Sequence, residues 1–237
     1  MFKEVKKENA FHDILNQILE QIQNGTLNPG DALPTERNMA EAMHISRPIL
    51  REALRALELL GILTSVRGGG NYVSKDIEHC LIGPLSILFR LNNSSVLQAQ
   101  ELRSALECRA VMLAAEKCTP VDAAELQLYI AKLDAEENEK LRADLDRDLH
   151  MKIGKMAENP MIFSVLSASS QLTENIISGI RSYIMQKNHT SSDVDEQHKK
   201  LVDAITHHQT ALAGQYMQEH MATIEKYINE LMELNKL

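Results

Sequence analysis

Apolar residues recur at intervals of three and four along most of the chain, which is the spacing of one face of an α-helix. One such series comprises Leu97, Leu102, Ala105, Leu106, Ala110, Leu113 and Ala114. From about residue 76 onward hardly any alternating strand pattern is present, and breakers such as Asn159-Pro160 divide the region. We therefore expect helices near residues 77–91, 95–118, 121–137, 138–158, 161–187, 192–207 and 209–235. The short links between them predict antiparallel neighbours in an all-α helical bundle.

Two short helices joined by a tight turn are predicted before residue 60. The first covers Pro34–Met43, and the second begins after Ser46, which occupies an N-cap position with Pro48 in the first turn. Every fourth residue of the second helix is an arginine, so three cationic side chains form one stripe along it. The stripe consists of Arg47, Arg51 and Arg55. A tight turn followed by such a stripe is typical of a helix-turn-helix that enters the major groove of DNA.

A β-hairpin is predicted directly after these helices. Gly61 ends the second helix, and short β-rich runs lie on either side of Gly68-Gly69-Gly70, with Arg67 near the tip. Glycine allows a positive φ and lets the backbone approach a phosphate or a minor groove. The alternative is an ordinary solvated helix face, with Glu52 and Glu58 nearby, and a plain glycine loop. Cap, turn, stripe and wing follow one another within about forty residues, and this order favours DNA binding.

Residues from about 9 to 75 resemble the winged helix-turn-helix of the GntR family of bacterial transcription regulators. The motif residues are Gly25-x-x-x-Pro29-Gly30-x-x-Leu33-Pro34-x-Glu36-Arg37, then Ser46-Arg47-x-x-x-Arg51-Glu52-Ala53-Leu54, then Gly61 and Gly68-Gly69-Gly70. The resemblance implies that Arg37, Arg47 and Arg51 contact DNA, and that Arg55 supports packing or contacts a phosphate. With the turn and the wing included, the candidate DNA-binding residues are Arg37, Ser46, Arg47, Arg51, Arg67 and Gly69.

The distribution of charge supports a division into two domains, residues 1–75 and 76–237. The chain has 237 residues and a net charge of −8, which taken whole argues against a nucleic-acid binder. Residues 1–75, however, carry nine basic and nine acidic residues, so the excess of acid lies in the second part, away from DNA. Three cysteines without metal spacing, no signal peptide and no apolar run near the roughly 20 residues of a membrane helix indicate a cytoplasmic protein.

Four polar residues interrupt the apolar faces of the later helices. Asp146 and His150 are four residues apart on one face, His198 shares a face with apolar neighbours, and His220 lies among methionine and isoleucine. A carboxylate and three imidazoles that point into a bundle from three helices are the ligand set of a first-row transition metal. The alternative is a set of ordinary half-buried histidines, which is possible in a chain with nine of them.

The region from about Leu97 to Leu231 resembles the all-helical FCD effector domain of the FadR subfamily. Its metal-binding members carry Asp-x-x-x-His in one helix and single histidines in two later helices, which match Asp146, His150, His198 and His220. The resemblance implies a divalent transition metal, with zinc as the first choice and nickel or manganese as alternatives. Leu149 departs from the pattern because the family often has an aromatic residue there, but this side chain packs and does not bind the metal.

Arg103 is the candidate effector-binding residue. It falls near the apolar stripe that contains Leu106 and Ala110. In one interpretation it forms a surface pair with Glu107, worth a few tenths of a kcal/mol, roughly 0.2–0.5. In the other it is a buried guanidinium that grips a carboxylate with two hydrogen bonds. The resemblance favours the second, because an arginine at this place faces the effector pocket in the family.

Together these features predict a metabolite-responsive regulator that binds operator DNA as a homodimer and senses a small carboxylate. One helix-turn-helix recognises a half-site, so a two-fold dimer on a palindromic operator is expected. The main alternative is a metal-dependent hydrolase with an appended DNA-binding module, since the same ligands could activate water. Against it, no clear general base, nucleophile elbow or His-Glu-x-x-His motif is present, so we expect no enzyme. A constitutive DNA-binding protein with a purely structural metal is a weaker alternative.

Overall fold

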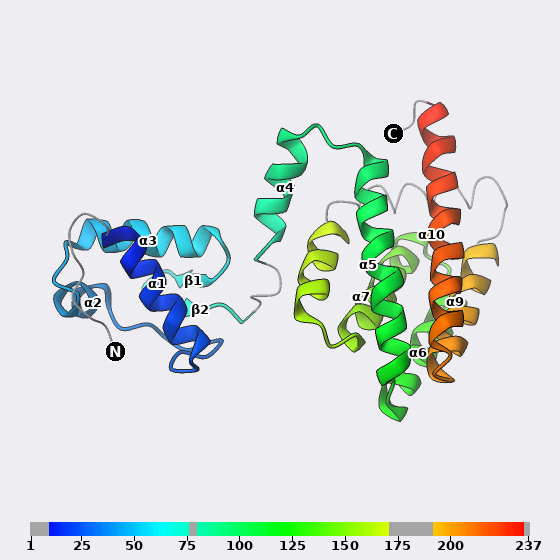
Figure 1. Cartoon of the computed structure of the whole chain (residues 1–237), viewed down its shortest axis with the longest axis horizontal. Coiled ribbons are helices and arrows are strands. Elements are labelled where there is room, and N and C mark those ends of the chain that lie inside the picture. Colours follow the sequence, from blue (N-terminus) through cyan, green and yellow to red (C-terminus); the bar gives the residue numbers. More distant parts are fainter. Residues whose placement is uncertain (1–9, 76–79, 171–191, 235–237) are drawn as a thin grey trace. The chain divides into compact units, whose positions relative to one another are not determined.

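The computed structural model describes residues 10–75, 80–170 and 192–234, which form two compact units, Met1–Pro84 and Leu85–Leu237 (Figure 1). The predicted fold class is confirmed: a small helical unit with a two-stranded wing is followed by an all-α unit. Among the described residues, none of the helices combines the length and the apolar character needed to cross a membrane.

The first unit is a winged helix-turn-helix. Its elements are α1 (Ala10–Gln23), α2 (Glu36–Ala42), α3 (Arg47–Leu59), β1 (Leu63–Val66) and β2 (Gly70–Val73). The helices bury one face each, and Ile14 and Ile18 of α1 meet Leu50 and Leu57 of α3 in a single core. This burial leaves the opposite face of α3 exposed.

The turn between α2 and α3 depends on local backbone chemistry. The Thr35 hydroxyl accepts a hydrogen bond from the Asn38 amide at 3.2 Å and so caps α2. His44 takes a positive φ of 53°, which lets the chain reverse within three residues. Ser46 stands at the predicted N-cap of α3, but its side chain makes no capping hydrogen bond.

The wing is an antiparallel hairpin in which Leu63 pairs with Val73 and Val66 pairs with Gly70. Gly68 and Gly70 have φ values of 78° and 99°, which explains why glycine is needed on both sides of the tip. Gly69 has a different reason: a Cβ there would lie 3.0 Å from Cγ1 of Val66.

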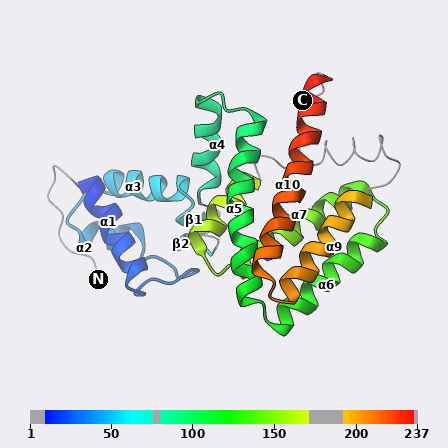
Figure 2. The same ribbon diagram turned by 45° about the vertical axis from the view of Figure 1, so that its right-hand side comes forward.

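The second unit is the predicted antiparallel bundle. Its elements are α4 (Ile82–Leu91, which the division between the units crosses), α5 (Val96–Lys117), α6 (Pro120–Ala135), α7 (Glu139–Met156), helical residues 160–170, α9 (Ser192–Thr206) and α10 (Thr210–Glu233). Figures 1 and 2 show α5 and α10 side by side and running in opposite directions. Most of the predicted segment 161–187 and the start of 77–91 lie outside the described residues.

Local caps fix where several of these helices begin. Ser95 with Gln98, and Thr119 with Asp122, form reciprocal capping boxes at α5 and α6. The Asn138 side chain accepts from two backbone amides at the start of α7. These signals are readable in the sequence, which is why the predicted boundaries agree with the observed ones to within a few residues.

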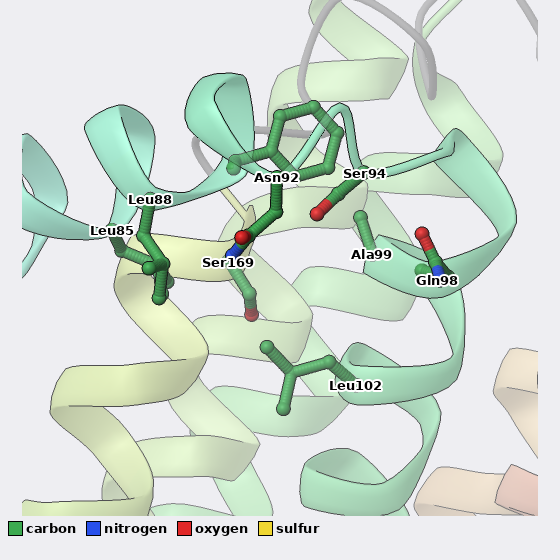
Figure 3. Close-up of a pocket in the computed structure, with 9 residues that line it drawn as sticks. Leu85, Leu88, Asn92, Ser94, Gln98, Ala99, Leu102 and Ser169 are labelled. Carbon is green, nitrogen blue, oxygen red and sulfur yellow. The ribbon is translucent and has the colours of Figure 1, made fainter.

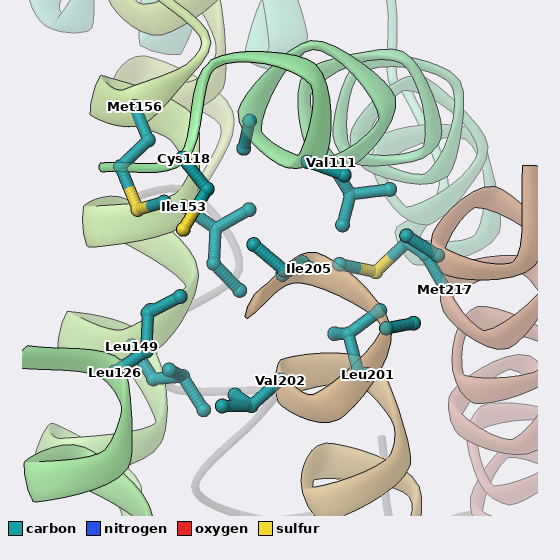
Figure 4. Close-up of a cluster of buried hydrophobic side chains, with 14 of the residues drawn as sticks. Val111, Cys118, Leu126, Leu149, Ile153, Met156, Leu201, Val202, Ile205 and Met217 are labelled. Atoms are coloured by element: carbon teal, nitrogen blue, oxygen red, sulfur yellow. The ribbon is translucent and has the colours of Figure 1, made fainter. Parts of the chain in front are cut away.

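The core of the bundle lies between α7, α9 and the helices around them (Figure 4). Leu149 and Ile153 of α7 meet Leu201, Val202 and Ile205 of α9, and all five side chains are almost completely buried. Leu149 directly precedes His150, and Leu201 follows His198 by about one helical turn, so the packing that stabilises the bundle also holds the helix segments that carry both imidazoles.

Candidate metal centre

Three histidines from three helices converge in the interior of the second unit. His150 of α7, His198 of α9 and His220 of α10 are 2%, 0% and 2% exposed, and each offers a ring nitrogen within 4.8 Å of the others. The Nε2 atoms of His150 and His198 are 3.3 Å apart. Their ring centres lie 4.6 to 5.4 Å from one another.

Asp146 lies at the edge of this cluster. Its Oδ1 atom is 3.1 Å from Nε2 of His198, and the residue is 5% exposed. The structure thus brings together all four side chains that the sequence singled out, from positions up to 74 residues apart in the chain (Asp146 to His220).

The outer ring nitrogens of two histidines have protein partners. Nδ1 of His150 contacts a carboxylate oxygen of Glu107 on α5. Nδ1 of His220 lies 3.2 Å from Oε1 of Gln197, whose amide nitrogen donates to Thr223 Oγ1 at 2.9 Å. An acceptor at Nδ1 places the ring proton there, so that Nε2 carries the lone pair that a metal needs.

Electrostatics favour the ligand form of these groups. Burial alone would raise the pKa of Glu107, but Arg103 and His150 overcome this effect and bring the pKa to about 2, so the group is a carboxylate. Burial, and after it the neighbouring His198 and His150, hold the pKa of His220 well below its usual value. Near neutral pH His220 is therefore an uncharged imidazole, which is the form that binds metal.

The residues fit a divalent transition metal. Three imidazole nitrogens and one carboxylate oxygen match the donors that zinc, nickel and related ions prefer. Without an ion, three adjacent buried imidazoles would crowd their nitrogen lone pairs together. Carboxylate–histidine pairs such as Glu107–His150 commonly orient metal ligands.

Arg103 lies beside this centre on α5. Only 3% of its surface is exposed, and its Nε atom is 2.5 Å from Oε1 of Glu107. The predicted pairing with Glu107 is therefore present, but the pair is buried, and the surface interpretation is wrong on that point. No acceptor bonds the outer guanidinium nitrogens in the part of the chain that the structure describes. The charge of Arg103 also acts on His220.

An apolar pocket of about 160 Å³ lies on a different side of α5 (Figure 3). It is lined by Leu85, Leu88, Phe89, Asn92, Ser94, Gln98, Ala99, Leu102 and Ser169. The lining contains no charged side chain, so this pocket lacks the chemistry that would hold a carboxylate.

The predicted DNA-binding side chains are on the surface of the first unit. Arg47 follows the turn and makes no ion pair with any residue in the described ranges. Arg51 pairs with Glu36 of α2 at 2.6 Å and Arg37 pairs with Glu41 at 2.9 Å, although the two arginine side chains stay 55% and 74% exposed. The other predicted positions, Ser46, Arg67 and Gly69, are exposed in the turn and at the wing.

Comparison with known proteins identifies both units. Residues 12–73 match the family described as bacterial regulatory proteins, gntR family, and residues 98–223 match the FCD domain. A relative from Bacillus subtilis (strain 168), the uncharacterized HTH-type transcriptional regulator YcbG, is 30% identical over 97% of this chain and 94% of its own length. The chain belongs to the GntR family of transcription regulators and has the FadR-like arrangement of domains.

Other similar proteins are named as transcription regulators or as GntR proteins. The Glc operon transcriptional activator of Escherichia coli (strain K12) is 25% identical over 92% of this chain and 88% of its own length. A solved structure of Streptococcus agalactiae GntR superposes with a TM-score of 0.74 at 22% identity, covering 91% of this chain and 99% of that one. Both matched domains of this GntR-family regulator are those of transcription regulators, and neither match indicates a catalytic family.

Two residues that contact the histidines of the candidate metal centre were not predicted as functional from the sequence. Glu107 was considered only as a surface partner of Arg103, and Gln197 not at all. A signal for Glu107 is present, since it is four residues after Arg103 and three before the buried Ala110. Gln197 directly precedes a predicted ligand, but no spacing rule distinguishes it from an exposed glutamine.

Proposed function

We propose that this regulator binds operator DNA as a homodimer and senses a small carboxylate at a metal centre in its helical unit. The observation that carries the proposal is the burial and the incomplete hydrogen bonding of Arg103. Its guanidinium is buried, yet only one of its N–H groups has an acceptor among the described residues. A buried cation with unused donors beside three imidazoles is suited to an anionic ligand.

The charge balance of the centre supports an anion. A divalent ion and Arg103 would carry three positive charges, and the carboxylates of Glu107 and Asp146 carry two negative charges, which leaves one positive charge. All three of these side chains are buried. A monoanion would complete the balance, and a carboxylate suits the planar fork of arginine. The metal would be held by Asp146, His150, His198 and His220, and it would supply a Lewis acid for a carboxylate oxygen.

The first unit supports DNA binding through α3. Arg47 is exposed at its start, and Arg51 and Arg37 are tied only by ion pairs that lie at the surface. Such exposed pairs contribute about 0–1 kcal/mol, so both arginines can exchange a carboxylate partner for a phosphate or a base edge at little cost. One α3 recognises one half-site, which is the reason for proposing a two-fold dimer.

The metal is tested by elemental analysis after purification without chelators. We expect about one transition-metal ion per chain, as a single site requires. Replacement of His150 and His198 together by alanine should abolish it, while replacement of the exposed His207 should leave it unchanged. Absence of metal from the parent, both as purified and after reloading, would disprove the centre.

The effector is tested with a panel of small carboxylates in a thermal-shift assay, followed by operator titrations. Arg103→Lys keeps a positive charge for Glu107 but removes the planar fork, so it should weaken the effector while preserving metal content and effector-free operator binding. The matched control is Arg109→Lys, because Arg109 lies on the exposed side of the same helix. An unchanged response of the Arg103→Lys protein would show that this side chain has only a structural role.

A further inference from the structure

Gln100 is a buried polar residue of α5 that the proposed centre does not use. Only 3% of it is exposed, and its amide nitrogen lies 3.3 Å from the sulfur of Met221. A thioether is a weak acceptor, and no other hydrogen bond to Gln100 is present within the described ranges. Buried amides in folded proteins almost always have good partners, so this one calls for an explanation.

The position of Gln100 relates it to the candidate effector site. Gln100, Arg103 and Glu107 follow one another at three and four residues, and all three are buried on the same face of α5. That face meets α10, which runs beside α5 in the opposite direction (Figure 2). Met221, the residue that contacts Gln100, directly follows His220 of the metal centre. The amide therefore lies one helical turn from Arg103 and contacts the residue that follows His220 in α10.

We propose that Gln100 determines effector specificity by hydrogen-bonding a second polar group of the bound carboxylate. This inference rests on the proposed function. A primary amide both donates and accepts, so it suits a hydroxyl group in either role. Methionine has an unbranched side chain with several rotatable bonds, so Met221 can repack around a ligand. The effector class thus becomes a small carboxylate that carries a hydroxyl group, in preference to the same acid without it.

The apolar pocket on the other side of α5 offers no comparable argument. Of its polar lining residues, Asn92 and Gln98 are exposed, and Gln98 already caps its own helix by bonding Ser95 (Figure 3). Ser169 is buried, but its hydroxyl already donates to the Leu166 carbonyl at 2.9 Å. Gln100 differs because it is buried, lacks a good partner and shares a face with an unsaturated guanidinium.

The test uses pairs of acids that differ only in one hydroxyl group. Metal-loaded full-length protein is titrated calorimetrically with propionate and L-lactate, with succinate and L-malate, and with butyrate and 3-hydroxybutyrate. In the parent we expect the hydroxylated member of at least one pair to bind tenfold or more tightly, because a site built to bond a hydroxyl discriminates against its loss. In Gln100→Met this preference should fall to less than threefold, with the affinity for the plain acid nearly unchanged.

A second readout separates this role from a structural one. Because Gln100→Met replaces a poorly bonded buried amide with an apolar chain of similar length, the ligand-free protein should melt at the same temperature as the parent or higher. Gln218→Met makes the same change on the exposed side of α10 and should alter neither readout.

Each remaining outcome has a defined meaning. If the parent shows no hydroxyl preference in any pair, or if Gln100→Met keeps that preference in full, the specificity role is disproved. If Gln100→Met melts well below the parent and loses the plain acid together with the hydroxylated one, the residue is structural and the inference fails. If no acid of the panel binds metal-loaded parent, the proposed carboxylate sensing itself fails, which is distinct from a failure at Gln100 alone.

Discussion

At the scale of single residues, Glu107 links the two halves of the candidate site. One carboxylate oxygen accepts a hydrogen bond from Arg103 and the other contacts His150, so a single buried group holds both the cation and a candidate metal ligand. An effector that bonds the outer guanidinium nitrogens of Arg103 would therefore be connected to His150 through Glu107. The spacing of four residues predicts that Arg103 and Glu107 form a pair. It does not reveal that both side chains are buried, and burial distinguishes this pair from a weak pair on the surface.

We expect Glu107→Gln to lower metal affinity by about 10–100-fold, the usual effect of losing a group that orients a metal-binding histidine. The amide keeps the shape of the side chain but removes the charge that fixes the His150 proton at Nδ1. Chelator competition measures the affinity, and Glu116→Gln on the exposed side of α5 is the control. Equal affinities in all three proteins would mean that Glu107 serves only to neutralise Arg103.

At the scale of elements, local sequence signals determine most of what was predicted correctly. The predicted helix Pro34–Met43 corresponds to α2, which Thr35 caps. The predicted arginine stripe of α3 lies on the exposed side, opposite the buried Leu50, Ala53, Leu54 and Leu57. What these signals cannot supply is the partner of each arginine. Arg51 pairs with Glu36, fifteen residues earlier, and only the folded turn brings the two together.

Substitution of the recognition helix should weaken specific DNA binding without loss of the fold. Arg47→Ala and Arg51→Ala should each cost roughly 1–3 kcal/mol per lost base contact, because their exposed side chains contribute little to the core. Fluorescence anisotropy with operator and with unrelated DNA gives the specific part of the affinity. Arg109→Ala in the second unit controls for the loss of one positive charge, and an operator affinity equal to the parent's in both α3 variants would contradict the assignment of α3.

At the scale of the whole molecule, the centre exists only because four distant segments meet. Glu107, His150, His198 and His220 come from α5, α7, α9 and α10, and the packing of Leu149, Ile153 and Leu201 brings α7 and α9 into register. The convergence of the three histidines could be predicted, since each is a polar residue on an apolar helix face. Their outer partners could not, because Gln197 sits on a partly exposed position that no periodicity marks.

Because the centre joins several helices, removal of metal should affect the second unit as a whole. A ligand at a hundred times its dissociation constant stabilises the folded state by about 2.7 kcal/mol, so chelation should remove stabilisation of this order from the bundle. For a unit of about 150 residues this corresponds to a fall in melting temperature of roughly 5–10 °C. Calorimetry of the full chain should show the fall in the transition of the bundle, while operator binding by the first unit persists without effector.

After chelation, carboxylates should no longer change operator affinity, whereas in metal-loaded protein we expect a change of about 1–3 kcal/mol. The protein with alanine at His150 and His198 should be insensitive to both metal and chelator. A carboxylate response that survives chelation would separate the effector from the metal and leave Arg103 as its principal anchor.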